Sequence, residues 1–253
     1  MYEANKKLGQ NFLVDINIAQ TMVESLGVAE GDEVIEIGPG LGALTDFLGK
    51  LTHLVKFNLT AVDIDKRFTS KLESMFAEKP TVFIVNEDIL RFLPHFESDK
   101  DIKIVGSLPF YITSPILHAM IKMKKQPSRI VIMIQKEVAK KIINDAPDGS
   151  YLSVFTQTFF NVTRVVEVPR TKFKPEPDVD ATVISLTKND VFMSPEKIEK
   201  YEGFLHKVFK NPRKMLNKAL SQDELKKGEV GPSLRPQEVS AQKWLDFFQK
   251  VCS

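Results

Sequence analysis

Short apolar stretches alternate with amphipathic ones along the first three quarters of the chain. The apolar stretches have the length of strands and are rich in β-branched residues; they comprise Glu33–Ile37, Leu59–Val62, Val82–Val85, Ile102–Val105 and Ile130–Ile134. Enough chain for a helix separates each stretch from the next, and an earlier helix is predicted by the spacing of Ile16, Ile18, Ala19, Met22, Val23 and Leu26. This alternation predicts an α/β fold in which a parallel sheet carries helices on both faces.

Two more strands are predicted at Val162–Val168 and Ala181–Leu186, and a proline-rich connector joins them. Their proximity in the chain favours an antiparallel addition at one edge of the sheet. After the second of these strands the pattern becomes helical, and one of the predicted helices lies within Pro236–Val251. We therefore expect a main domain over residues 1–188 and a small helical domain over residues 189–253.

The composition excludes several classes of protein. Of the 253 residues, 43% are hydrophobic and 27% are charged, which is typical of a globular protein. No apolar run approaches the roughly 18 residues of a membrane span, and the polar start of the chain does not resemble a secretory signal. The only cysteine is Cys252 and the four histidines are scattered, so we expect no disulfide, no metal site and a cytoplasmic protein. The net charge of +2 does not by itself indicate a nucleic-acid partner.

A glycine-rich turn, Gly38-Pro39-Gly40-Leu41-Gly42, follows the first strand of the predicted parallel sheet. Glycines let backbone N–H groups approach a ligand, and the helix that follows favours polar or anionic groups at its N-terminus. Asp63 ends the next strand, where it can accept hydrogen bonds from ribose, and Asp88 ends the third, where it can bind an adenine amino group. These aspartates are alternatively helix caps. Polar groups at the ends of three successive strands favour an adenosine ligand.

The fourth strand runs into Gly106-Ser107-Leu108-Pro109-Phe110-Tyr111. Proline stiffens such a turn, so the Ser107 hydroxyl and the Leu108 carbonyl are placed to accept hydrogen bonds from an exocyclic amino group. Phe110 can stack on a planar base. Accepting both amino hydrogens makes the nitrogen a better nucleophile toward a methyl group on a sulfonium. A simple β-turn with a core phenylalanine is the alternative, which the upstream glycine turn makes less attractive.

Five segments, in this order, resemble the ribosomal RNA adenine N6,N6-dimethyltransferases, especially the KsgA-type small-subunit enzymes: Lys7–Leu13, Glu36–Gly42, Leu108–Phe110, Gln135–Ala139 and Phe173–Asp180. The resemblance implies a Rossmann-like, seven-stranded methyltransferase fold with a C-terminal helical domain, and S-adenosylmethionine as the methyl donor. It also implies transfer to N6 of two adjacent adenosines in the 3′-terminal hairpin loop of 16S rRNA, in an immature 30S particle. We expect a monomer with no membrane partner.

The resemblance also implies site residues on the donor side. Asn11 and Leu13 would contact the donor from the N-terminal segment, and Gly38 would lie under its methionine part. Asp63 would bind the ribose, and Asp88 the adenine ring.

On the acceptor side, Phe173 would form a second aromatic wall over a flipped adenine, beside Ser107, Leu108 and Phe110. Ser107 stands where the family has asparagine, and this position would also reach the donor. Serine is shorter and has no amide, so we expect activity to persist with a changed rate or product.

Basic residues follow one another at roughly helical spacing early in the predicted helical domain: Lys207, Lys210, Arg213, Lys214 and Lys218. They are a solvated helix face or an RNA-binding surface, and the nearby base-pocket motifs favour RNA.

Two alternatives remain open for the function of the whole chain. One is a large-subunit (23S) rRNA methyltransferase of the kind that confers macrolide resistance. The other is a non-catalytic ribosome-assembly factor, for which Ser107 is the only hint.

Overall fold

The structure is a computed structural model that describes residues 9–252, apart from the side chain of Phe110. The chain divides into two compact units. The first contains the residues up to Ala139 together with Thr163–Lys188, and the second contains Lys140–Val162 together with the residues from Asn189 onwards. A boundary near residue 189 was expected from the sequence; the structure also groups the earlier segment Lys140–Val162 with the C-terminal helices.

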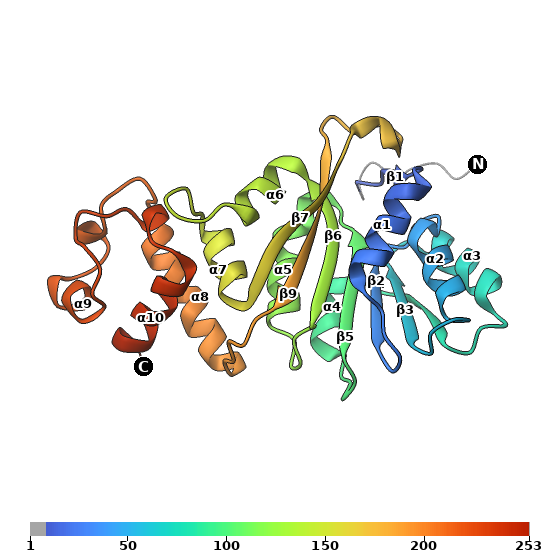
Figure 1. The fold of residues 1–253 in the computed structure, drawn as a ribbon, viewed down its shortest axis with the longest axis horizontal. Coiled ribbons are helices and arrows are strands. Elements are labelled where there is room, and N and C mark those ends of the chain that lie inside the picture. Colours follow the sequence, from blue (N-terminus) through green and yellow to red (C-terminus); the bar gives the residue numbers. More distant parts are fainter. Residues whose placement is uncertain (1–8, 253) are drawn as a thin grey trace. The chain divides into compact units, whose positions relative to one another are not determined.

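A seven-stranded sheet has the order β4-β3-β2-β5-β6-β9-β7, and all but the first residues of β7 belong to the first unit (Figure 1). Strands β2 to β6 pair in parallel, whereas β9 pairs antiparallel with β6. The predicted α/β class, the parallel sheet and the antiparallel addition are therefore confirmed. The strands are β2 (Glu33–Ile37), β3 (Asn58–Asp63), β4 (Val82–Asn86), β5 (Ile102–Ser107), β6 (Arg129–Gln135), β7 (Phe160–Val168) and β9 (Ala181–Lys188).

Helices connect the strands and cover the sheet, with α1 in front of it and α4 and α5 behind it in Figure 1. The apolar stripe predicted for the first helix is buried at Ala19, Met22, Val23 and Leu26. In the centre of the sheet the side chains of β6 are buried on both faces, as a near-continuous apolar run predicts. The helices of this part are α1 (Ile16–Leu26), α2 (Ala43–Leu51), α3 (Lys66–Phe76), α4 (Ile89–His95) and α5 (Thr113–Ile121), and α6 (Lys136–Ile143) runs from the first unit into the second.

A second, two-stranded sheet joins segments that are far apart in the sequence. Strand β1 (Phe12–Leu13) pairs antiparallel with β8 (Phe173–Lys174), and Leu13 lies opposite Phe173. The sequence pattern did not predict this sheet, because two residues are too few to show a strand periodicity.

The second unit is helical and has an aromatic core. Its helices are α7 (Tyr151–Phe159), α8 (Pro195–Phe209), α9 (Gln222–Lys227) and α10 (Ala241–Val251). The Tyr201 hydroxyl lies 2.9 Å from Thr158 Oγ1, and the Trp244 indole donates to the carbonyl of Pro236, so two polar groups of this core have partners. The fully buried rings are Tyr201, Phe155, Phe159, Phe160, Trp244, Phe247 and Phe248. Among the described helices, none is long and apolar enough to cross a membrane.

Strands β2 and β5 approach one another closely at Gly106, directly before Ser107. A Cβ atom at this position would lie 2.5 Å from the carbonyl oxygen of Ile37. We predict that Gly106→Ala destabilises the protein by about 1–3 kcal/mol, because the added methyl group forces the strands apart. Gly203→Ala is the control: no atom lies within 4 Å of the added Cβ in α8, so this change should stabilise by about 0.5–1 kcal/mol. Urea unfolding followed by circular dichroism measures both, and equal effects would contradict the argument.

Candidate active site

A cavity of about 250 Å³ opens in the first unit where strands β2, β3, β4 and β5 end. Ligand sites of open α/β sheets lie at this carboxyl edge, because the strands end there and the loops diverge. The backbone of Phe110 begins a short 3₁₀ helix beside the cavity, and its side chain lies outside the described part of the structure. The expected site residues that line the cavity are Asn11, Leu13, Gly38, Asp63, Asp88, Ser107, Leu108 and Phe173.

The glycine turn is folded onto the neighbouring strand β3. Gly38, Gly40 and Gly42 all have positive φ angles, which glycine adopts without the steric cost that a Cβ brings. The Gly38 N–H donates to the carbonyl of Val62, and the Gly40 N–H donates to Asp63 Oδ2 at 3.0 Å. The turn and the aspartate are therefore held as one unit at the floor of the cavity.

Asp63 is buried, and each of its oxygens accepts a backbone N–H: Oδ2 from Gly40 and Oδ1 from Asp65. Burial raises the pKa of Asp63, while these hydrogen bonds oppose the rise. The side chain that caps α3 is Asp65, not Asp63. Asp63 therefore does not act as the cap of α3, and its remaining lone pairs are available to a ligand in the cavity.

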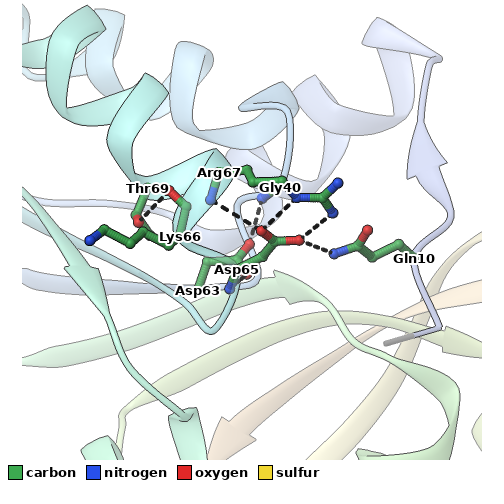
Figure 2. Close-up of polar contacts among 7 residues, drawn as sticks. All are labelled: Gln10, Gly40, Asp63, Asp65, Lys66, Arg67 and Thr69. Carbon is green, nitrogen blue, oxygen red and sulfur yellow. Dashed lines mark hydrogen bonds and ion pairs between the residues drawn. The ribbon is translucent and has the colours of Figure 1, made fainter. Parts of the chain in front are cut away.

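Asp65 has a different environment, shown in Figure 2. The Arg67 guanidinium donates to both of its oxygens, at 3.0 and 2.6 Å, and the Gln10 amide donates to Oδ2 at 2.9 Å. The Arg67 hydrogen bonds lower the pKa of Asp65 to about 2, with a smaller contribution from Gln10. Asp65 is therefore an ionised carboxylate at neutral pH. The sequence pattern did not indicate Gln10 or Asp65 as site residues.

Glu36 lies inside β2 and lines the cavity, with 1% of the residue exposed. Oε1 accepts a hydrogen bond from Thr45 Oγ1 at 3.0 Å, whereas Oε2 has no hydrogen-bond partner among the described residues. Burial, with a smaller contribution from the charge of the nearby Asp63, raises the pKa of Glu36 to about 8, and the hydrogen bond from Thr45 opposes the rise. A buried carboxyl oxygen without a partner is costly, and a ligand that donates a hydrogen bond or carries a positive charge would satisfy it.

Asp88 has one of the two roles that were weighed from the sequence, that of a helix cap, and its position leaves the other role open. It is half-buried, lines the cavity and caps α4 by accepting the N–H of Leu90 at 2.9 Å. The cap uses Oδ1 alone, so capping and ligand binding are compatible in this residue.

The turn at the end of β5 lines another part of the cavity. The Leu108 N–H donates to the carbonyl of Met133 at 3.0 Å, which holds the turn against β6. Phe173 lines the cavity with only 3% of the residue exposed, because most of its ring packs in the hydrophobic core. Tyr111, which was not among the expected site residues, lines the same cavity with 60% exposed. The sequence feature that could have indicated Tyr111 is its position, since it is an aromatic residue two positions after Pro109 of the turn.

The basic segment of the second unit does not have the helical spacing expected from the sequence. Helix α8 ends at Phe209, and turns and bends follow, so that expectation is wrong beyond Lys207. Lys207 is paired with Glu224 at 3.0 Å. Lys210, Arg213 and Lys214 are exposed, and within residues 9–252 the structure shows no side-chain partner for them.

The comparison with protein families gives one match over nearly the whole chain. The model of the family described as ribosomal RNA adenine dimethylase matches residues 1–251. The chain belongs to this family. A relative from Hydrogenobaculum sp. (strain Y04AAS1), named ribosomal RNA small subunit methyltransferase A, is 41% identical over 224 residues, which are 88% of this chain and 85% of the relative. A protein of the same name from Mycoplasma mobile is 36% identical over 257 residues and 97% of each chain.

Solved structures share the fold. The 23S rRNA methyltransferase ErmE has a TM-score of 0.74 and 25% identity, over 96% of this chain and all of that one. A dimethyladenosine transferase from Plasmodium falciparum has a TM-score of 0.79 and 22% identity, over 95% of this chain and 98% of that one. The predicted methyltransferase fold and the predicted membership of the adenine dimethylase family are confirmed.

This fold and this family imply S-adenosylmethionine as the methyl donor. The cavity fits such a ligand, because it offers Asp63 for hydroxyl groups and the unpartnered Glu36 oxygen for a cationic or hydrogen-donating group. Within residues 9–252, no group of three or more histidine, cysteine, aspartate or glutamate side chains is arranged to hold a metal ion.

The raised pKa of Glu36 predicts a pH dependence of stability. The folded protein holds this proton more tightly than the unfolded chain, so Glu36 contributes stability that is present below pH 4.5 and is lost as the pH rises to about 8. Glu36→Gln should therefore flatten the fall of the free energy of unfolding across this range. Thr45→Val is the matched control, because it removes the hydrogen bond to Glu36 but keeps the carboxyl group. This hydrogen bond lowers the pKa of Glu36, so its loss should make the free energy of unfolding fall more steeply with pH. Urea unfolding at several pH values measures this, and a wild-type slope in Glu36→Gln would contradict it.

Proposed function

We propose that this chain transfers methyl groups from S-adenosylmethionine to N6 of two adjacent adenosines in the 3′-terminal hairpin loop of small-subunit rRNA. The observation that carries the proposal is the single cavity that collects the glycine turn, Asp63, Asp88 and the Ser107–Leu108 turn in a member of the adenine dimethylase family. The substrate would be an immature 30S particle in the cytoplasm, and the enzyme would act on it as a monomer. The large-subunit alternative is not favoured, since the relatives of 31–41% identity are named as small-subunit enzymes.

On the donor side, Asp63 would accept hydrogen bonds from the ribose hydroxyls, and Asp88 one from the adenine amino group. Gly38 would lie under the methionine part, because its positive φ and missing side chain keep that part of the cavity open. Asn11 and Leu13 would contact the donor from the N-terminal side. The bound donor supplies a methyl group on a positively charged sulfur.

On the acceptor side, Ser107 Oγ and the Leu108 carbonyl would accept the two hydrogens of the adenine amino group. These hydrogen bonds turn the nitrogen lone pair toward the methyl group, so that a C–N bond forms while the C–S bond breaks. The proton becomes acidic once the methyl group is attached and passes to water, so no general base is needed. Phe110 would stack on the base, and Phe173 would support that wall from the core.

RNA affinity would come chiefly from the second unit. Lys210, Arg213 and Lys214 are exposed cations without protein partners among the described residues, which suits contacts to phosphates. Lys207 is paired with Glu224, so it would contact a phosphate only if this ion pair were broken.

The direct test is methyl transfer from radiolabelled donor to purified immature 30S particles, with the modified bases mapped in the rRNA. Label in two adjacent adenosines near the 3′ end supports the proposal. Label in the 23S rRNA of large-subunit particles would support the resistance-enzyme alternative. Particle binding without any label would support the assembly-factor alternative.

For Ser107, we predict that Ser107→Ala lowers the rate of methyl transfer by about 10-fold, because one acceptor for the amino group is lost. Ser107→Asn should keep or raise the rate, because an amide oxygen replaces the hydroxyl. Ser70→Ala, on the exposed face of α3, is the control and should not change the rate. Single-turnover kinetics with saturating donor measures these rates. An active wild type with an equally active Ser107→Ala would remove this role from Ser107 and leave the enzyme assignment intact.

For RNA binding, we predict that the double variant Arg213→Ala, Lys214→Ala binds particles more weakly and with a smaller salt dependence. Each lost phosphate contact should reduce the slope of log K against log salt by about 0.7–0.9. The control, Lys56→Ala with Lys124→Ala, removes two exposed charges before β3 and β6, at the opposite edge of the sheet from the cavity. Filter binding over a salt series measures the slopes. Equal slopes in the wild type and the Arg213, Lys214 variant would place the RNA elsewhere.

A further inference from the structure

The segment Gly9–Asp15, which we call the strap, borders the donor cavity. At one end Gly9 packs beside the ring of Tyr111, since a Cβ atom there would lie 3.4 Å from the ring. At the other end the Val14 N–H donates to the carbonyl of Lys172, and Asp15 is ion-paired with the same lysine at 2.7 Å. Between these ends, strap residues Gly9 to Leu13 line the cavity.

The middle of the strap is held on the side of helix α3. The ring of Phe12 packs edge-on against Phe68, with centroids 5.4 Å apart, and lies close to Gly40 of the glycine turn. Two residues earlier, the Gln10 amide donates to Asp65 Oδ2 at 2.9 Å. In Figure 2 the Gln10 side chain extends from the strap toward Asp65, with the Arg67 guanidinium beside it.

Asp65 connects the strap to Asp63, the residue that we propose binds the ribose. Its backbone N–H donates to Asp63 Oδ1 at 2.9 Å, while its side chain accepts from Gln10. The chain of contacts therefore runs from Asp63 through Asp65 to Gln10. Because Asp65 is ionised and buried, its hydrogen bond with Gln10 is charge-assisted and stronger than one between neutral groups.

We propose that the Gln10–Asp65 hydrogen bond fastens the strap over the donor cavity, which makes Gln10 and Asp65 positioning residues that slow the release of the donor. The inference rests on the proposed function, since the cavity must bind S-adenosylmethionine. It goes beyond that function, because neither side chain is required to touch the donor or the reacting atoms. Pairing with β8 holds the strap at Phe12 and Leu13, and Gln10 holds it earlier through Asp65, whose N–H donates to Asp63.

Three substitutions at Gln10 test the bond without altering Asp65, which also caps α3. Gln10→Met keeps the length of the side chain but cannot donate, and should release S-adenosylhomocysteine about 10-fold faster than the wild type. Gln10→Glu places a second carboxylate against Asp65, so release should be faster still. Gln10→Lys restores a donor with a positive charge, and its release rate should return to that of the wild type or below. Gln20→Met on α1, which breaks an exposed Gln20–Glu24 hydrogen bond, should change nothing.

Two measurements separate the strap from the donor. Hydrogen exchange of residues 10–14, followed by mass spectrometry without any ligand, reports whether the strap is fastened; Gln10→Met and Gln10→Glu should exchange faster there, and Gln10→Lys should not. Stopped-flow release of S-adenosylhomocysteine reports donor retention. Unchanged exchange in Gln10→Glu, or loosened exchange with wild-type release, would overturn the proposal. A wild-type protein that binds neither S-adenosylmethionine nor S-adenosylhomocysteine would instead overturn the proposed function, and the strap proposal with it.

Discussion

The hydrogen bond from the Gly40 N–H to the Asp63 carboxylate joins the two turns on which the active site depends. It exists because β2 and β3 are parallel neighbours, so that the glycine turn after one strand meets the aspartate at the end of the other. On the far side of β2, the absence of a side chain at Gly106 lets β5 come close enough to place Ser107 at the same edge. The pairing of strands therefore brings the residues of the site together.

Electrostatics divides the carboxylates at this edge into two kinds. Glu36 and Asp63 are buried, and burial raises the pKa of each, so their surroundings in the protein disfavour their negative charge. Asp65 is bound by Arg67 and its pKa is lowered to about 2. The first kind is suited to a ligand that brings hydrogen-bond donors or positive charge. The second kind is already satisfied by protein groups, which suits a structural contact such as the one with Gln10.

The strands of the sheet were predictable because buried parallel strands form continuous apolar runs. The positions of Asp63 and Ser107 were predictable because these residues end such runs, and that of Asp88 because it follows β4 by two residues. Contacts made by short or irregular segments could not be predicted from the sequence. The β1–β8 pair and the Gln10–Asp65 bond join residues that are far apart in the sequence, and neither leaves a periodic signal. The end of α8 at Phe209 was also missed, although Pro212 follows shortly and disfavours a continued helix. The grouping of Lys140–Val162 with the C-terminal helices depends on tertiary packing alone.

The proposed donor and acceptor sides of the cavity differ in how strictly they restrict which residues can stand there. The donor side combines backbone N–H groups, positive φ angles and buried carboxylates, and few other residues satisfy those conditions. The acceptor side consists of a proline turn, one hydroxyl, a backbone carbonyl and the exposed ring of Tyr111. In the proposed mechanism, a backbone carbonyl and ring faces would be available to a flipped base whatever residue stands at position 107. Serine, where the resemblance implies asparagine, would therefore change one acceptor of the amino group. The geometry of the donor side, which depends on β2 and β3, would be independent of that change.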